Sequence, residues 1–301
     1  MTKYPNFLII GAAKAGTTAM YNYLIQHPNI FMPKVKEPKF FCFRDLECKW
    51  TGPGDRKAYK NYITKIEDYE KLFHEVKDET AIGEATPWYL YSSYAADGIK
   101  SNIPNAKLII ILRNPVERAF SHYKHLKSLG RETSKNFIDA LNAESKRKEL
   151  GWGWTWLYKE RGKYFEQVKY YLDRFDRDKI KIFFYEDFIE DNQSVINEVC
   201  DFVGVSPLVI TMEKKNQRTI PKFPTVHSFL KRTRISRLFS YNKIEKLLVK
   251  SGFRGQVPEK LTADNRQFLY NYYKEDIIKL EALLDVKLDR WKLNDSSVEK
   301  I

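Results

Sequence analysis

The sequence predicts an α/β fold, a three-layer sandwich in which helices cover both faces of a central, mainly parallel sheet. Two observations support this prediction: short β-rich apolar runs alternate with helical patterns, and a glycine-rich loop joins the first such run to a helix. Strands that alternate with helices favour a parallel sheet covered on both faces. With 301 residues, 43% of them hydrophobic, the chain suits a single domain over residues 1–301 with ample material for a core.

The predicted elements follow from the alternation of apolar runs and helical patterns. In chain order they are a strand at Phe7–Ile10, a helix at Thr17–Gln26, strands at Ala81–Glu84 and Lys107–Leu112, helices at Pro115–Leu129 and Lys163–Phe175, a strand at Ile180–Tyr185, and helices at Gln193–Val203 and Thr262–Leu284. The mixed stretch Cys42–Tyr62 is predicted to be loop, and Leu293–Ile301 a frayed tail. Ligands of such sheets bind beyond the carboxyl ends of the strands, so the residues after Ile10 and Leu112 are the first candidates for a site.

Two stretches raise expectations about aromatic packing. The helix Lys163–Phe175 should bury one stripe because four of its apolar residues recur at helical spacing. These residues are Phe165, Val168, Leu172 and Phe175. The run Gly151–Trp156 combines glycine with tryptophan, which suits either a partly exposed aromatic surface near a ligand or a local aromatic core.

Most of the formal net charge of +13 lies in one segment. Residues 214–254 hold twelve Lys or Arg and one acid, so they carry +11, and the rest of the chain is close to neutral. A local basic surface favours a specific anionic partner, although a solvated basic face is the simpler alternative. Within it, residues 227–250 mix apolar and basic side chains, which suits peripheral contact with an anionic membrane, a face for an acidic substrate, or a helix docked on the sheet.

The sequence also bears on where the protein works. The longest apolar runs, such as Leu108–Leu112, are strand length, whereas a membrane span needs about 20 apolar residues. The apolar run near the N-terminus is too short for a signal peptide and leads straight into a glycine loop. Cys42, Cys48 and Cys200 form an odd, sparse set without CxxC spacing, which favours reduced thiols and a cytoplasmic location.

The glycine loop after the first strand is the first candidate site. It reads Gly11-Ala-Ala-Lys-Ala-Gly-Thr-Thr18 and opens directly into a helix. The glycines permit a tight turn whose backbone N–H groups point inward, and the helix N-terminus adds about half a positive charge. Together they predict an anion cradle and make the expected fold a P-loop-containing sandwich.

This loop differs from that of a nucleotide kinase. It has the GxxxxG spacing of a Walker A motif but not its Lys-Ser/Thr ending, and Lys14 lies inside the loop. A kinase holds Mg²⁺ with a Walker A hydroxyl and a second acid, whereas the strand Lys107–Leu112 ends in Arg113. A sulfuryl group carries less negative charge than a phosphoryl group, so a lysine and backbone donors could stabilise its transfer.

His122 and His125 lie three residues apart and could form a metal-binding pair. The sequence shows no evident third ligand for a metal ion, so no metal is expected.

Arg113 and Ser121 form the second candidate anchor. Asn114 is a good N-cap, Pro115 suits the first helical position and Glu117 completes a capping-box pattern, so Arg113 should stand at the carboxyl end of its strand. Ser121 lies seven residues past Asn114, about two turns on and nearly on the same face. An arginine fork and a serine hydroxyl suit a phosphate monoester.

Together these stretches resemble the family of sulfotransferases that use 3′-phosphoadenosine 5′-phosphosulfate (PAPS). Lys14–Thr18 is similar to the family's 5′-phosphosulfate loop, and Leu112–Ser121 to its 3′-phosphate site. Two further stretches, Lys36–Phe41 and Gly83–Tyr89, resemble segments of the heparan sulfate sulfotransferases and their bacterial relatives. The resemblance covers roughly residues 5–205 and the final helix.

The resemblance implies a role for each matching residue. The donor would be held at its 5′ end by Lys14, Ala15, Gly16, Thr17 and Thr18, and at its 3′ phosphate by Arg113 and Ser121. Glu37 matches the general base that deprotonates the acceptor, with Glu84 as the rival carboxylate. Ala85 stands where the family often has lysine, so Lys36 or Lys39 would have to supply that charge.

The family also closes a basic C-terminal loop over the nucleotide. Its counterpart here is Lys214–Lys222, at the start of the basic segment 214–254, which is expected to act as a cap or substrate-side segment. Arg218 and Lys222 are the residues expected to contact phosphate.

The sequence therefore predicts an enzyme that moves a sulfuryl group from PAPS to a hydroxyl acceptor, with a carbohydrate as the expected acceptor and 3′-phosphoadenosine 5′-phosphate (PAP) as product. Two alternatives stay open: a P-loop nucleotide kinase, and a nucleic-acid-binding protein that uses residues 214–254. If the sulfotransferase prediction holds, no nucleic-acid partner is expected.

Overall fold

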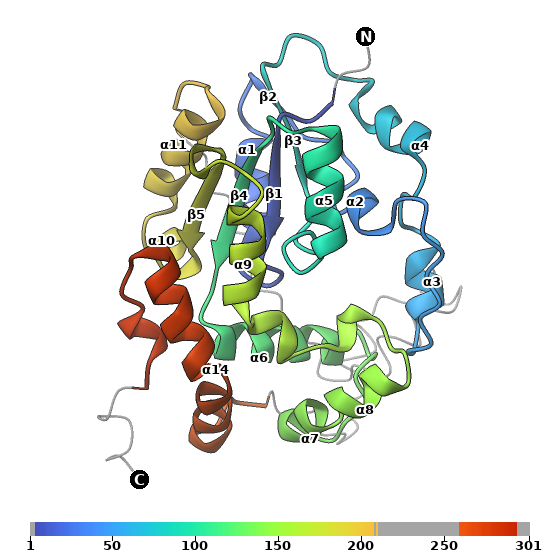
Figure 1. Ribbon diagram of the computed structural model, residues 1–301, viewed down its shortest axis with the longest axis vertical. Coiled ribbons are helices and arrows are strands. Elements are labelled where there is room, and N and C mark those ends of the chain that lie inside the picture. The colour runs from blue at the N-terminus through green and yellow to red at the C-terminus, as the bar shows by residue number, and fades with distance from the viewer. Residues whose placement is uncertain (1–3, 208, 210–258, 294–301) are drawn as a thin grey trace, which may run out of the picture.

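The computed structural model describes residues 4–207, 209 and 259–293. Within these residues, five parallel strands form a sheet in the order β2-β3-β1-β4-β5 (Figure 1). The strands are β1 Phe7–Gly11, β2 Ile30–Phe31, β3 Ala81–Ala85, β4 Lys107–Leu112 and β5 Ile180–Phe184. The fold class and the four predicted strands are confirmed. Strand β2 escaped prediction because two residues show no periodicity.

Helices surround this sheet. They are α1 Thr17–Leu24, α2 Phe40–Phe43, α3 Asp55–Tyr59, α4 Ile66–Glu70, α5 Ser93–Asn102, α6 Pro115–Ser128, α7 Phe137–Asn142, α8 Glu144–Glu149, α9 Tyr164–Leu172, α10 Tyr185–Glu190, α11 Asn192–Val203 and α14 Ala263–Leu284. Short 3₁₀ turns are η1 Lys71–Phe73, η2 Trp154–Trp156, η3 Glu160–Gly162, η4 Arg177–Lys179 and η6 Asp289–Trp291. The five predicted helices are present, and the predicted loop 42–62 contains one short helix, α3, and the end of another, α2.

The connections between strands explain the layers. Helix α1 links β1 to β2 in one direction across the sheet, whereas α5 and α9 lie on the links that run in the other direction, from β3 to β4 and from β4 to β5. Because crossovers between parallel strands are right-handed, opposite directions place helices on opposite faces. Accordingly, α5 packs against α9, and α1 against α11. The carboxyl ends of the strands point toward α6 and the lower part of Figure 1.

The buried stripe of α9 differs from the predicted one. The side chains buried on it are Tyr164, Val168 and Tyr171, joined by Phe175 just beyond the helix, while Phe165 and Leu172 are half-buried. Tyrosine can occupy these core positions because each hydroxyl has an acceptor: Tyr171 donates to the Tyr89 carbonyl at 2.8 Å, and Tyr164 to the Arg113 carbonyl at 3.0 Å. The tyrosines thereby tie α9 to the loops that follow β3 and β4.

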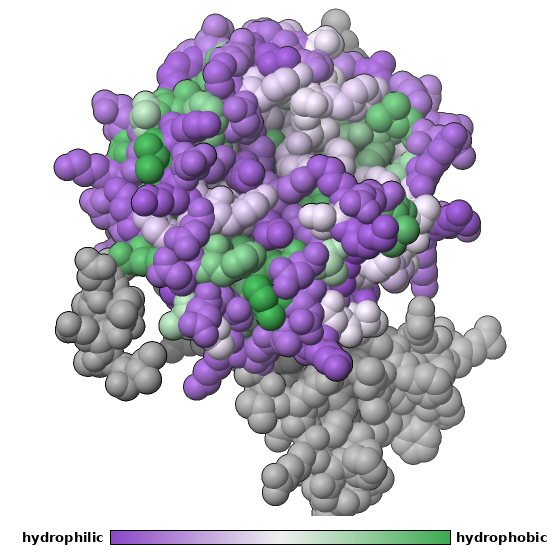
Figure 2. Space-filling model, turned by 60° about the horizontal axis from the view of Figure 1, so that its bottom comes forward, coloured by the Kyte–Doolittle hydropathy of each residue, from purple (hydrophilic) through white to green (hydrophobic). Residues whose placement is uncertain are grey.

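The core and the surface are clearly separated. Strands β1 and β3 are buried along their whole length, and in β4 only Lys107 is not. On the face shown in Figure 2, hydrophilic side chains predominate and hydrophobic ones form small separate patches. Among the described residues, no helix combines the length and apolarity that crossing a membrane requires.

Candidate functional site

The loop between β1 and α1 forms the centre of the site. Gly16, the N-cap of α1, has φ +93°, and a Cβ there would lie 3.1 Å from the Tyr185 ring and 3.2 Å from Phe188, so both the backbone conformation and the close packing favour glycine. Lys14 also adopts a left-handed conformation, with φ +73°. No side chain caps α1, which leaves its first backbone N–H groups directed at the loop. This geometry suits an anion.

Arg113 reaches the same loop from the neighbouring strand. Strands β1 and β4 pair directly, and the Ala12 N–H donates to the Ile111 carbonyl at 2.7 Å. The Arg113 guanidinium donates to the Lys14 carbonyl at 3.1 Å and stacks 4.5 Å from the centre of the Tyr185 ring. The two predicted anchors therefore lie together at the carboxyl ends of adjacent strands.

The start of α6 holds Arg113 in position. The Asn114 carboxamide accepts from the backbone N–H groups of Val116 at 3.0 Å and Glu117 at 3.5 Å, so the predicted N-cap is confirmed. The Asn114 N–H in turn donates to the Glu186 carboxylate of α10 at 3.0 Å, a contact that no local pattern revealed. Ser121 follows two turns later on α6 and is half-buried.

Glu37 lies at the carboxyl end of β3, on the other side of the loop. Its N–H donates to the Ala85 carbonyl at 3.1 Å, and its carboxylate binds the ammonium groups of Lys36 at 2.9 Å and Lys39 at 3.4 Å. Burial alone would raise the pKa of Glu37, but Lys39 and Lys36 outweigh it and hold the pKa below its usual value. Glu37 is therefore a carboxylate at neutral pH.

Backbone strain marks the same segment. Glu37 and Lys39 both have φ +61°, a conformation that residues other than glycine rarely adopt. The Lys39 N–H lies 3.4 Å from the Thr86 hydroxyl, which links the segment a second time to the end of β3. Strained residues held in place by their surroundings are concentrated at functional sites.

Glu84, the rival carboxylate, lies beneath this segment in a fully buried position. The Thr86 hydroxyl donates to one of its oxygens and the Tyr69 hydroxyl to the other at 3.2 Å. Burial raises the pKa of Glu84 to about 7, although the hydrogen bonds from Thr86, Tyr89 and Tyr69 oppose the shift. Since its carboxyl group is enclosed, Glu84 supports the Glu37–Lys39 segment through Thr86 and is not open to an acceptor.

An aromatic cluster adjoins Lys39. Its ammonium group lies 4.7 Å from the centre of the Tyr62 ring and 5.0 Å from that of Trp88. Trp154 from η2 packs edgewise or tilted against neighbouring rings, namely Phe43, Trp50, Trp88 and Tyr91. The glycine–tryptophan run thus contributes to a local aromatic core, with Trp156 buried and Trp152 and Trp154 half-buried.

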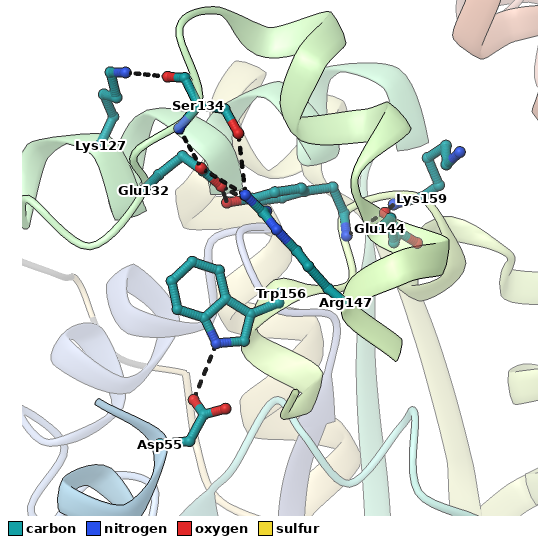
Figure 3. A network of polar contacts seen from close by, with 9 residues as sticks. Asp55, Lys127, Glu132, Ser134, Glu144, Arg147, Trp156 and Lys159 are labelled. Carbon is teal, nitrogen blue, oxygen red and sulfur yellow. Dashed lines mark hydrogen bonds and ion pairs between the residues drawn. The ribbon is translucent and has the colours of Figure 1, made fainter. Parts of the chain in front are cut away.

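A buried polar network holds the segment that carries these tryptophans (Figure 3). Arg147 binds Glu132 through two hydrogen bonds, at 2.7 and 2.8 Å, and the Tyr158 hydroxyl donates to Glu132 at 2.6 Å. Asp55 accepts from the Trp156 indole at 3.1 Å. Glu144 accepts from three successive backbone N–H groups, those of residues 158, 159 and 160, at 2.8, 2.7 and 3.0 Å. The network thereby holds the backbone of residues 158–160, which lead into η3.

The basic segment 214–254 lies wholly outside the described residues. Three further expectations concern residues outside the described part of the chain. They are the phosphate contacts of Arg218 and Lys222, the membrane or substrate contact of residues 227–250, and the frayed tail after Leu293. They stay predictions.

A parallel sheet with a glycine loop after one strand and an arginine after its neighbour is the arrangement of a P-loop-type protein, in which ligands bind beyond the carboxyl ends of the strands. The family model of the sulfotransferase domain matches residues 4–280. The chain belongs to this family, which confirms the predicted resemblance.

Two of the compared proteins are similar over most of the chain. A crystal structure of a sulfotransferase from Alicyclobacillus acidocaldarius is 33% identical with a TM-score of 0.77, over 96% of this chain and 99% of that one. The bifunctional heparan sulfate N-deacetylase/N-sulfotransferase 4 of Mus musculus is 28% identical over 93% of this chain. The membrane-associated sulfotransferase kil1 of Dictyostelium discoideum is 37% identical over 40% of it. The matches span 30% and 22% of these two curated relatives.

Proposed function

We propose that this protein transfers a sulfuryl group from PAPS to a hydroxyl group of a carbohydrate. The observation that carries the proposal is the hydrogen bond of 3.1 Å between the Arg113 guanidinium and the Lys14 carbonyl. It brings two anion-binding elements close enough for one nucleotide with phosphate at both its 5′ and 3′ positions. The uncapped N-terminus of α1 and the close packing around Gly16 fit the phosphosulfate end of such a ligand.

Each side chain has a chemical task in this reaction. Glu37, held as a carboxylate by two lysines, accepts the proton of the acceptor hydroxyl. Lys14 stabilises the negative charge that develops on the departing phosphate oxygen, while Gly16, Thr17 and Thr18 bind the 5′ phosphate. Arg113 and Ser121 bind the 3′ phosphate. Lys39 or Lys36 supplies the positive charge that Ala85 does not.

Two relatives support a saccharide as the acceptor. Their names assign one to heparan sulfate and another, carbohydrate sulfotransferase 15 of Homo sapiens, to carbohydrate. The latter is 30% identical over 41% of this chain and 28% of that protein. Because the first of these names specifies N-sulfation, an acceptor screen has to include amines as well as hydroxyls.

The proposal is tested by incubating the protein with PAPS labelled in its sulfuryl group and a panel of saccharides that carry free hydroxyls or free amines. We expect labelled, hydroxyl-sulfated sugar and binding of PAP in calorimetry. Mg²⁺-dependent ATP binding without PAP binding would instead establish a nucleotide kinase. Nucleic-acid binding that survives physiological salt, without PAP binding, would establish the third alternative.

A further inference from the structure

Three buried basic side chains form a cluster that the roles above do not use. Arg118 and His122 lie one turn apart on α6, and Arg161 lies on η3, which packs against α6. Their exposed fractions are 0%, 5% and 4%. No carboxylate of the described residues lies within 4.0 Å of any of them, according to the ion pairs that the structure shows. A guanidinium group that is buried without a paired carboxylate is unfavourable, so Arg118 and Arg161 call for an anion nearby.

The hydrogen-bonding capacity of the cluster is also unfilled. Arg118 donates from one nitrogen to the Tyr158 carbonyl, but its Nε and Nη1 meet no acceptor within the described part of the chain. The same holds for Nδ1 of His122. Arg161 lies 5.1 Å from the centre of the Trp88 ring and 6.0 Å from that of Tyr91. These contacts hold the guanidinium by its face, which leaves the N–H groups at its edge for a ligand.

The network of Figure 3 fixes this arginine. Glu144 binds the three backbone N–H groups that lead into η3, and the Tyr273 hydroxyl of α14 donates to the Lys159 carbonyl at 2.9 Å. A Cβ on Gly162, the next residue after Arg161, would lie 2.7 Å from that hydroxyl. The backbone of Arg161 is therefore set firmly, as a binding group requires.

The charges of the loop lysine and of Glu37 both act on the cluster. Burial and the positive charges of Arg161, Arg118 and Lys14 hold the pKa of His122 well below its usual value. Burial and the charge of Arg118 lower the pKa of Arg161 to about 10, while Glu37 acts in the opposite direction. Trp88 connects the two ends, because Lys39, the partner of Glu37, contacts the same ring as Arg161.

We propose that Arg161, with Arg118 and His122 behind it, binds the sulfuryl group of the donor while that group passes from the phosphate oxygen to the acceptor. This assignment rests on the proposed function. In the transfer, the bond from sulfur to the 5′ phosphate oxygen breaks and its electron pair stays on that oxygen, beside Lys14. A new bond forms from sulfur to the acceptor oxygen, whose proton passes to Glu37. The sulfuryl oxygens carry negative charge throughout the transfer. A basic cluster between Lys14 and Glu37 would bind these oxygens.

Binding of PAPS and of PAP separates this role from others, because PAP lacks the sulfuryl group. Calorimetry without acceptor is run on the wild type, Arg161→Gln and Arg113→Ala. For Arg161→Gln we expect the Kd of PAPS to rise about 10-fold or more, the loss typical of a charged hydrogen bond, and the Kd of PAP to stay within about 2-fold. Arg113→Ala, which removes a 3′-phosphate contact, should weaken both ligands by similar factors.

The remaining outcomes are also decisive. Equal weakening of PAPS and PAP in Arg161→Gln, or no weakening of either, would overturn the assignment. In steady-state sulfuryl transfer, a change confined to the KM of an anionic acceptor would also overturn it, because the cluster would then bind the acceptor and not the donor. Should Arg161→Gln fail to fold, Arg161→Lys, which keeps the charge but loses the fork, still has to weaken PAPS more than PAP. A wild-type protein that binds neither nucleotide would refute the proposed function itself.

Discussion

Glu37 illustrates how few contacts set the chemistry of a residue. Two ammonium groups flank its carboxylate, and both come from residues one and two positions away, so the pairing is local in sequence. The orientation of the Glu37–Lys39 segment is not set locally. Its backbone N–H groups donate to the Ala85 carbonyl and the Thr86 hydroxyl at the end of β3. A base held in this way is ionised before substrate arrives and needs no further proton transfer to become active.

Replacing Glu37 with Gln should therefore lower turnover by about 10²- to 10⁴-fold, the usual contribution of general base catalysis, with little change in PAP affinity. The measurement is steady-state sulfuryl transfer together with calorimetry of PAP. Glu75→Gln is the matched control, since Glu75 is an exposed carboxylate paired only with Lys34 in the described residues. Near-normal turnover in the Glu37 variant would exclude it as the base.

At the scale of the element, a buried polar network joins the segment before α7, helix α8 and the residues between η2 and η3. The Glu132–Arg147 pair lies at the centre, with side-chain exposures of 0% and 7%. Burial raises the pKa of Glu132, but hydrogen bonds from Arg147, Tyr158 and the Ser134 N–H more than offset this and lower it to about 2. The pair is thus charged on both sides at any pH where the protein would be assayed.

Replacing Arg147 with Met should lower the free energy of unfolding by about 3–5 kcal/mol, because it leaves the Glu132 carboxylate buried without its partner. Urea unfolding followed by tryptophan fluorescence measures this change. Lys146→Met on the same helix is the control: its pair with Glu149 is exposed, and its loss should change stability by no more than about 1 kcal/mol. Equal effects of the two substitutions would contradict the central role of the buried pair.

For the whole molecule, two buried carboxyl groups respond to pH in opposite directions. The folded-state pKa of Glu132, about 2, lies below the ordinary value of 4.5, so its stabilisation is present above pH 4.5 and is lost as the pH falls toward 2. The folded-state pKa of Glu84, about 7, lies above 4.5. Between pH 4.5 and 7, Glu84 of the folded protein keeps a proton that the unfolded chain has released. Stability therefore falls as the pH rises from 4.5 to 7.

Glu84→Gln should remove the second of these dependences. We expect the variant to gain stability relative to the wild type as the pH rises from 4.5 to 7, by up to about 3 kcal/mol. Urea unfolding at a series of pH values measures the difference. A constant difference between variant and wild type across this interval would show that Glu84 does not titrate as its burial implies.

Local patterns were sufficient for much of the fold and for the two anchors. Strand β4, the cap at Asn114 and the loop around Lys14 are each encoded within about a dozen consecutive residues, and the rule for parallel sheets then predicts that the ends of β1 and β4 meet. The hydrogen bond from Arg113 to the Lys14 carbonyl shows that they do. Strand β2 and helix α5 were not predicted, and the buried face of α9 includes tyrosines that an apolar pattern passes over.

By itself, then, the sequence determined four of the strands, five of the helices and the anion loop, because backbone conformation and apolar periodicity act between near neighbours. The resemblance of its motifs indicated the family. The tertiary structure alone decided which charged side chains are buried. Nothing near Arg118, Arg161 or Glu84 in the chain marks them as core residues, since burial of a charge depends on the groups that fold around it. Those groups, such as Tyr158, Trp88 and Tyr69, come from other elements.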